Sequence, residues 1–331
     1  MKTQYLFRNL ILFLAASVFI GFAQVKPKVS LIGGDNVPAL KQKFTQTLET
    51  ILLELNRVNK GKGDLNSLKN YFSEESFRLL SQYVDQNHPY TARKQYSPQV
   101  IEREHGQFFD IRSIAMTVNL GETEASPTQN LILTFSQQGS VVSFRSMLPN
   151  IDYEHMISEG LTSVDSLTRG RVLDFMEQFR MAYNAKDTAF LEKVYSDEAL
   201  IIVGTVLRPK GQSDDFSRMT LLKEDKVKLI QQSKREYING LKKNAFKNSF
   251  LNVRFEDVKV LQHEKIPELY GISCKQYWNS SKYSDQGYLF LMMDYRKPDT
   301  PIIHVRSWQP QAFEDGSVVG LYDFDVVGYN K

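Results

Sequence analysis

One short segment near the C-terminus gathers side chains that could do chemistry. Alternation along a strand over residues 302–310 places His304, Arg306 and Trp308 on one face. That face then carries a titratable ring, a permanent cation and a large aromatic group. Tyr277 and Trp278 end a predicted neighbouring strand. The segment is the first candidate for a ligand-binding surface.

Two carboxylates are candidate partners for this face. Asp323 and Asp325 share one face of a predicted last strand, residues 318–327. If the strands pair in chain order, either carboxylate lies opposite His304 or Arg306 and forms a charge-assisted pair. Three interpretations stay open: a polar ladder on the solvent side of a sheet, the mouth of a ligand-binding cavity, or a catalytic site.

Two tyrosines on predicted helices complete the candidate set. An isomerase-type reaction needs a carboxylate base in an apolar cavity and a neutral donor aimed at the developing oxyanion. Tyr183, Tyr237 and Asp325 have the required chemistry. Aromatic residues at such helix positions are also typical of a core, and we expect Tyr183 and Tyr237 to be buried there.

Other chemistries are excluded by what the sequence lacks. The five histidines are scattered without ligand spacing, so no metal site is predicted, and no phosphate-cradling loop or Gly-x-Ser-x-Gly elbow occurs. We therefore expect no metal and no cofactor.

The net charge does not indicate a nucleic-acid partner. The formal charge of +3 includes two basic residues of the N-terminal leader, so the remaining charge is too small for a general affinity for nucleic acid. The single cysteine, Cys274, alternates with apolar residues and is expected to be a buried strand thiol.

The first 23 residues have the pattern of a secretory signal peptide. Lys2 and Arg8 precede an apolar run, and small residues follow it, so cleavage is expected after Ala23. The run is too short for a good membrane span, and no later segment is long and apolar enough for one. We expect an exported protein, periplasmic or extracellular, with no membrane span.

The elements that would position these residues repeat along the chain. Apolar residues at three-and-four spacing predict a long amphipathic helix from Leu40 to Val58 and a second one starting near Arg169. The segments that follow the two helices have similar sequences, because residues 63–77 match residues 186–200 at a constant offset. In these segments Asp64 and Asp187 are each placed to cap a short second helix. The match predicts an internal duplication, although any two helix-turn-helix segments look similar.

Both halves then become strand-like. Within residues 109–120, and again within residues 253–260, the alternating apolar residues change from odd-numbered to even-numbered positions. Such a change predicts a β-bulge in each half. A third helix is expected over Asp225–Phe246, with Tyr237 facing inward. The remaining strands are expected in the segments 130–136, 140–147, 269–278, 287–295, 302–308 and 318–327. Helices followed by antiparallel strands indicate the α+β class, with helices packed on a strongly curved sheet.

The domain plan follows from these elements. We expect a signal peptide over residues 1–23, an extended lead-in over 24–37, a first domain over 38–150, a linker over 151–168 and a second domain over 169–331.

The segment Phe175–Gly204, FMEQFRMAYNAKDTAFLEKVYSDEALIIVG, resembles the opening of a nuclear transport factor 2-like domain. The order of elements in the second half is similar to that superfamily, and the first half resembles a divergent copy. The resemblance implies a cone in which a curled sheet wraps helices, with isomerases, dehydratases, hydrolases and binding modules among its members. Dehydratase-like relatives favour a His–Asp pair, for which His304 and Asp325 are the candidates. The whole chain also resembles exported bacterial proteins of unknown function.

Three functional hypotheses follow. The favoured one is a non-catalytic binding or protein-interaction protein built on tandem cone-shaped domains. The second is a small-molecule isomerase or dehydratase-like enzyme using His304 with Asp325 or Asp323. The third is a structural part of the cell envelope, whose sheets dock on each other or on a second chain, including a homodimer. The predicted partner is an unknown protein or a small-molecule ligand. The predicted ligand-binding residues are Trp278, His304, Arg306, Trp308, Tyr183 and Tyr237.

Overall fold

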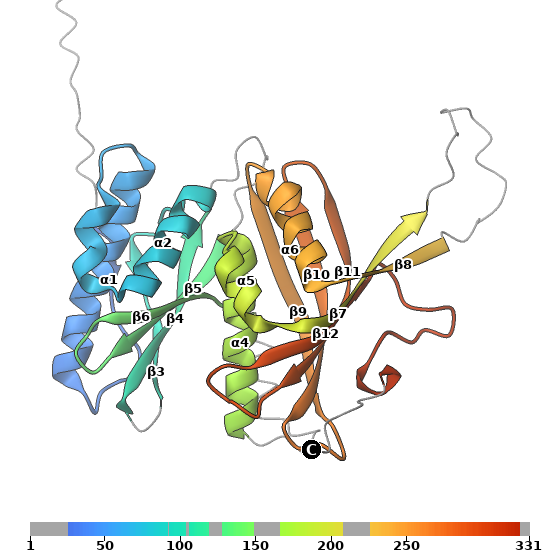
Figure 1. The fold of residues 1–331 in the computed structure, drawn as a ribbon. Coiled ribbons are helices and arrows are strands. Elements are labelled where there is room, and N and C mark those ends of the chain that lie inside the picture. Colours follow the sequence, from blue (N-terminus) through green and yellow to red (C-terminus); the bar gives the residue numbers. More distant parts are fainter. Residues whose placement is uncertain are drawn as a thin grey trace, which may run out of the picture.

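The computed structural model describes residues 26–91, 93–103, 106–118, 128–148, 166–207 and 226–324. The predicted signal peptide, most of the predicted linker and Asp325 lie outside these residues. In the described part the chain folds into two α+β units that lie side by side (Figure 1).

The first unit packs helices on one face of a four-stranded antiparallel sheet ordered β3-β4-β5-β6. A short parallel pair, β1 with β2, lies beside it. The elements are β1 (Lys28–Val29), α1 (Pro38–Asn59), the 3-10 helix η1 (Leu65–Tyr71), α2 (Glu74–Asn87), β2 (Gln95–Tyr96), β3 (Gln99–Arg103), β4 (Phe108–Thr117), β5 (Thr128–Ser136) and β6 (Val141–Ser146).

The second unit wraps a six-stranded sheet around three helices. The sheet is ordered β8-β7-β12-β11-β10-β9, and only the β7–β12 pair is parallel. The elements are α4 (Ser166–Asn184), α5 (Thr188–Val194), β7 (Tyr195–Leu207), β8 (Lys226–Gln232), α6 (Lys234–Lys243), η3 (Ala245–Lys247), β9 (Leu251–Gln262), β10 (Leu269–Ser280), β11 (Ser284–Asp294), β12 (Ile302–Gln309) and η4 (Leu321–Asp323).

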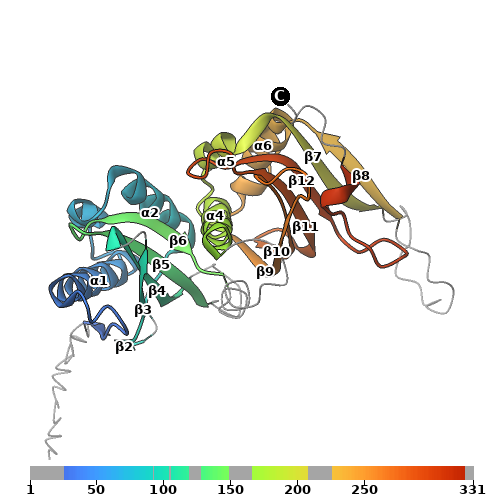
Figure 2. The same cartoon turned by 90° about the horizontal axis from the view of Figure 1, so that it is seen from below.

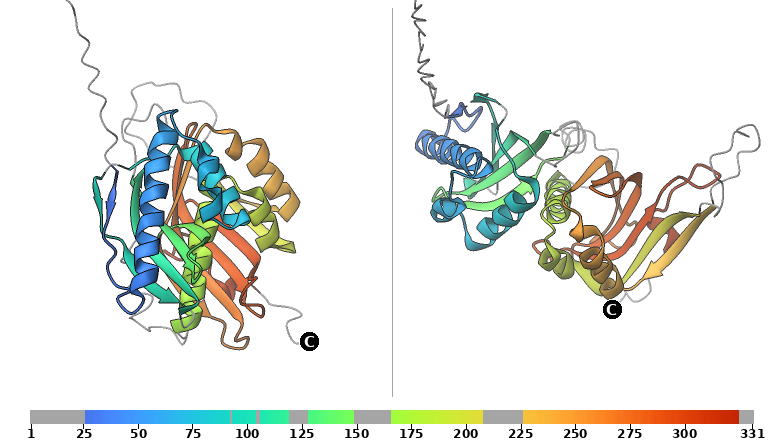
Figure 3. Two further views of the ribbon diagram at one scale, coloured as in Figure 1. Left: turned by 90° about the vertical axis from the view of Figure 1, so that its left-hand side faces the viewer. Right: turned by 90° about the horizontal axis from the view of Figure 1, so that it is seen from above.

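Helix α4 lies between the two sheets, as Figures 2 and 3 show. Val172 and Phe179 on this helix belong to the second unit's core, whereas Met181 and Ala185 pack with the first unit's core. A helix covered on two sides has little surface left for water, so its polar residues need partners inside the protein.

The local signals in the sequence are confirmed. Asp64 accepts a hydrogen bond from the backbone of Asn66, and Asp187 accepts one from Phe190, so each carboxylate caps the short helix after it. Both predicted bulges are present, marked by left-handed backbone at Ser113 and Asp257 and by a register shift beside each. Cys274 is buried in β10, as expected.

Two predicted elements are wrong. The described part of the expected helix Asp225–Phe246 begins with strand β8, because a capping box between Ser233 and Glu236 starts α6 only at Lys234. The expected last strand, residues 318–327, is not a strand in its described part, which contains the 3-10 turn η4. There Leu321 and Phe324 lie against the outer face of the sheet, where Phe324 stacks on Phe290.

The face of the first sheet that meets α4 carries charge. Arg112 on β4 donates to Glu177 through both terminal nitrogens, and Arg103 on β3 donates to Asp174 in the same way. Arg145 on β6 donates to Asp110, with 2.7 Å between nitrogen and oxygen. We call this group the interface ion cluster; its members are Arg103, Asp110, Arg112, Arg145, Asp174 and Glu177.

The charges in the interface ion cluster balance, with three guanidinium groups for three carboxylates. Burial would raise the pKa of Asp110, but Arg145 and Arg103 outweigh it and hold that pKa below its usual range. The stabilisation from Asp110 is therefore present above its ordinary pKa of about 3.9 and is lost as the pH falls below that value. Burial raises the pKa of Glu177 despite its arginine neighbours.

The two units share part of their topology. In the second unit, β7 follows the short helix α5 and runs parallel to the last strand of the meander, β12. In the first unit, Phe72 follows η1 and forms an isolated parallel bridge with Val141 on the last strand, β6. This correspondence favours the predicted duplication, with the β7–β8 hairpin reduced to one bridge in the first copy; the duplication stays a prediction.

None of the helices in the described part of the chain combines the length and the apolar character that crossing a bilayer requires.

Replacing Glu177 by Gln tests the interface ion cluster. The change keeps the side-chain shape but leaves Arg112 buried without its anion, so we expect the free energy of unfolding to fall by about 3–5 kcal/mol. The matched control is Glu192→Gln, which removes the exposed partner of Lys242 and should cost less than about 0.5 kcal/mol. Urea denaturation followed by circular dichroism measures both. Equal stability of Glu177→Gln and the parent protein would mean that Glu177 is already protonated and that its contact with Arg112 is not an ion pair.

Candidate functional site

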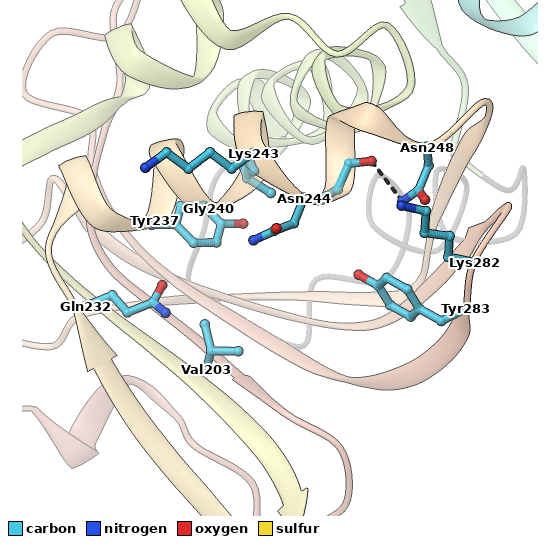
Figure 4. A pocket seen from close by; sticks show the side chains of 11 residues that line it. Val203, Gln232, Tyr237, Gly240, Lys243, Asn244, Asn248, Lys282 and Tyr283 are labelled. Carbon is cyan, nitrogen blue, oxygen red and sulfur yellow. Dashed lines mark hydrogen bonds between the residues drawn. The ribbon is translucent and has the colours of Figure 1, made fainter.

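A cleft lies between α6 and the concave face of the second sheet. It consists of two adjoining cavities of about 490 and 420 Å³ that share Val203, Tyr237, Leu241, Ala245 and Tyr283 as lining residues. We call the whole space the α6 cleft. Figure 4 shows the cavity of about 420 Å³, here called the outer cavity, with Lys243 and Lys282 at opposite sides of its opening. The cavity of about 490 Å³, which Arg306 and Trp308 line, is called the inner cavity.

The inner cavity holds donors that have no acceptor. The side chain of Arg306 is buried, and its Nε and Nη1 atoms lack a hydrogen-bond partner among the described residues. The same holds for the indole Nε1 of Trp308. Burial opposes the charged form of Arg306, but the tyrosines around it outweigh burial, so its pKa stays above the ordinary value. The cleft thus contains a permanent positive charge whose Nε and Nη1 donors are without an acceptor in the described part of the chain.

Three buried tyrosines, Tyr183, Tyr195 and Tyr237, lie together beside Arg306. The Arg306 guanidinium lies 4.9 Å from the centre of the Tyr237 ring, which is a cation–π contact. The Tyr183 hydroxyl lies 2.6 Å from that of Tyr237 and 3.3 Å from that of Tyr195. Burial raises the pKa of Tyr237 and of Tyr195 well above the usual value, so both remain neutral. These rings hold the guanidinium in place without neutralising it.

One carboxylate faces the same space. Asp285 stands opposite Trp278 in the β10–β11 register and lines the inner cavity together with Arg306. Although Asp285 is open to solvent at the cleft, partial burial raises its pKa to about 6, and Arg306 only partly offsets this effect. Asp285 therefore changes charge near neutral pH. Tyr283 stacks on Trp278 with 6.2 Å between ring centroids.

The shape of the inner cavity depends on a glycine. A Cβ atom at Gly287 would lie 2.4 Å from the carbonyl oxygen of Gln309 and 2.9 Å from the indole of Trp308. Only glycine lets the Trp308 ring lie this close to β11, against the floor of the cleft.

The structure brings together most of the predicted ligand-binding residues but not all. Trp278, Arg306, Trp308 and Tyr237 line the α6 cleft. Tyr183 lies behind them, buried beneath Tyr237 as part of the core.

The expectation that His304 shares a face with Arg306 is wrong. A bulge in β12 between Ile303 and Val305 breaks the alternation, so that Ile303 and Arg306 face the concave side. The Nε2 atom of His304 instead lies 3.4 Å from Oδ2 of Asp294, and His304 is not among the residues that line the cleft. The expected pairing of His304 with Asp323 is not formed either: the Asp323 carboxylate accepts from the backbone of Gly320. Asp325 lies outside the described residues.

Sequence reasoning missed Asp285, Gln276 and Tyr283. The predicted strand began at Gly287 and so left Asp285 in a loop, whereas β11 begins at Ser284. Continuing the alternation of Leu289 and Gly287 by one step would have placed Asp285 on the concave face.

Within the described ranges there is no group of three or more His, Cys, Asp or Glu side chains that could hold a metal ion.

No protein-family model matches this sequence, and no curated protein matches it. Among solved structures, the chain is similar to a nuclear transport factor 2-like protein from Cytophaga hutchinsonii, with 14% identity, a TM-score of 0.31 and coverage of 43% of this chain and 97% of that one. A nuclear transport factor 2-like superfamily protein from Salmonella enterica gives 7% identity, a TM-score of 0.33 and coverage of 45% and 94%. Naphthalene 1,2-dioxygenase with indole bound in its active site gives 12% identity, a TM-score of 0.35 and coverage of 49% of this chain and 93% of that one. The activities in these names belong to those proteins.

The titration of Asp285 can be read from its neighbour Trp278. The chain has two tryptophans, so in a Trp308→Phe variant the emission reports on Trp278 alone. We expect this emission to change with a midpoint near pH 6, because Asp285 gains its charge there. Adding Asp285→Asn should remove the transition, whereas Asp315→Asn, an exposed aspartate elsewhere, should keep it. A transition that survives Asp285→Asn would assign it to another group.

Proposed function

We propose that the second unit binds a small organic anion, a carboxylate attached to an apolar or aromatic body, in the α6 cleft. The single observation that carries this proposal is the buried guanidinium of Arg306 with two nitrogens unpaired. An unpaired buried charge is costly, and a ligand oxyanion would compensate it through charge-assisted hydrogen bonds.

The rest of the cleft supports the same ligand class. Its walls are mostly apolar or aromatic, formed by residues such as Val203, Leu241 and Trp308, and suit a hydrocarbon or ring. Lys243 and Lys282 at the opening add positive charge along the entry. The volume of each cavity falls in the range of small-molecule sites.

A second candidate is proton transfer on such a ligand, in line with the isomerase-like hypothesis. It is favoured by Asp285, whose pKa of about 6 suits a general base, beside donors that would stabilise an oxyanion. In this scheme Asp285 replaces His304, Asp323 and Asp325 as the acid–base group. Conversion of the bound anion, lost in Asp285→Asn while binding is retained, would identify an enzyme; unchanged ligand in the parent protein would identify a binding module.

Export of the chain, predicted from residues 1–23, is part of the proposal and rests on that segment alone. A homodimer formed through sheet packing is likewise a proposal. The outer sheet face that it would use is partly covered by Val319, Leu321 and Phe324.

Replacing Arg306 by Met tests the binding role. We expect the parent protein to bind 3-phenylpropionate at least tenfold more tightly than 3-phenylpropanol, because hydrogen bonds to charged groups contribute about 1.5–3 kcal/mol. Arg306→Met should remove this preference while leaving the free energy of unfolding unchanged or higher, since an unpaired buried charge becomes an apolar group. Isothermal titration calorimetry and urea denaturation measure the two effects.

Arg235→Met is the matched control, because Arg235 lies exposed on α6 outside the cleft. It should leave both the preference and the affinity as in the parent protein. Equal affinity of the acid and the alcohol for the parent protein would overturn the proposal.

A further inference from the structure

A second cavity lies where the two units meet. It has a volume of about 590 Å³ and is lined from both sides, by Gln129 on β5 of the first unit and by Arg180, Asn252, Arg254 and Tyr277 of the second. It is distinct from the α6 cleft, although Trp278 and Asp285 line both. We call it the interdomain cavity.

Arg180 brings a buried positive charge to this cavity. Among the described residues its hydrogen-bond acceptors are two backbone carbonyl oxygens, of Val253 at 2.9 Å from Nε and of Met147 at 2.6 Å from Nη1, and none is a carboxylate. The Nη2 atom has no acceptor in that part of the chain. Burial lowers the pKa of Arg180 to about 10, which leaves it charged at neutral pH.

A hydrogen-bonded chain across the interface positions a second donor. The Tyr83 hydroxyl donates to Gln129 at 2.9 Å, and the Gln129 amide donates to Asn252 Oδ1 at 3.0 Å. The second of these bonds fixes the Asn252 side chain through its oxygen. The Nδ2 donor of Asn252 has no acceptor within the described ranges. Arg254 adds a second guanidinium, held 4.9 Å above the Tyr277 ring.

The contrast with the interface ion cluster indicates what is missing. There, every arginine is paired with a carboxylate, whereas Arg180 has no carboxylate among its hydrogen-bond acceptors in the described residues. Asp285 is the single carboxylate among the lining residues, against two arginines, of which Arg254 also lies 3.8 Å from Glu256. The cavity is also too large for one small ion alone and has aromatic walls, Tyr277 and Trp278.

We propose that the interdomain cavity is a second ligand site, which takes a small organic oxyanion, a carboxylate or a phosphate monoester, on Arg180, Asn252 and Arg254. Such a ligand would also lie against Gln129 of the first unit and so favour the docked arrangement of the two units. Because Trp278 and Asp285 form a shared wall, its occupancy would also be felt in the α6 cleft.

The test uses the side-chain Nε–H signals of arginine in ¹⁵N-labelled protein, titrated with benzoate, with phenyl phosphate and with sodium chloride at matched ionic strength. We expect a saturable shift of the Arg180 signal with at least one oxyanion and none with chloride. Arg306 reports separately on the α6 cleft, so a probe bound there instead is recognised by its signal. The probe that saturates at the lower concentration decides between a carboxylate and a phosphate ligand.

Two variants and one control make the assignment specific. Asn252→Asp keeps the oxygen that accepts from Gln129 but adds a negative charge, and Arg254→Gln removes a half-exposed cation; each should weaken binding at least tenfold. Lys259→Gln, an exposed change further along β9, should alter it less than twofold. Shifts that do not saturate, that chloride reproduces, or that persist unchanged in Asn252→Asp would overturn the proposal.

Discussion

The neutralisation of charge on a helix buried between two sheets is the interaction on which the rest of this structure depends. Glu177 is fully buried on α4, and Arg112 of the opposite sheet supplies its counter-charge. Because α4 also contributes Val172 and Phe179 to the second core, the helix cannot shift to relieve one side without disturbing the other. The two units are thereby joined by matched charges as well as by apolar contacts such as that of Met181 with the first unit's core.

The same need for a counter-charge divides the buried arginines into two groups. Arg112 and Arg145 are buried and paired, and they serve the interface. Within the described residues, Arg306 and Arg180 have no carboxylate among their hydrogen-bond acceptors, and each lines a cavity. A buried cation without a hydrogen-bonded counter-charge lowers stability, and this cost is the basis of both binding proposals.

The failures of sequence reasoning have specific causes. Alternation along β12 was sound for Arg306 and Trp308, but one bulge turned His304 out of register. The third helix was drawn too long because the apolar residues of β8 match a helical spacing as well as an extended one over so few positions. The carboxylate that faces Arg306 comes from a hairpin, and its pairing with Trp278 depends on where the turn falls. Neither the bulge nor the turn leaves a clear mark in the sequence there.

What the sequence by itself determined is local. The caps at Asp64 and Asp187, the apolar stripes of the long helices and the bulges near Ser113 and Asp257 are set by contacts within a few residues, and each could be read from spacing alone. Only the tertiary structure decided which polar side chains are buried and which of those are paired. That outcome depends on residues such as Arg112 and Glu177, far apart in the chain, meeting across a packed interface, and no local spacing encodes such a meeting.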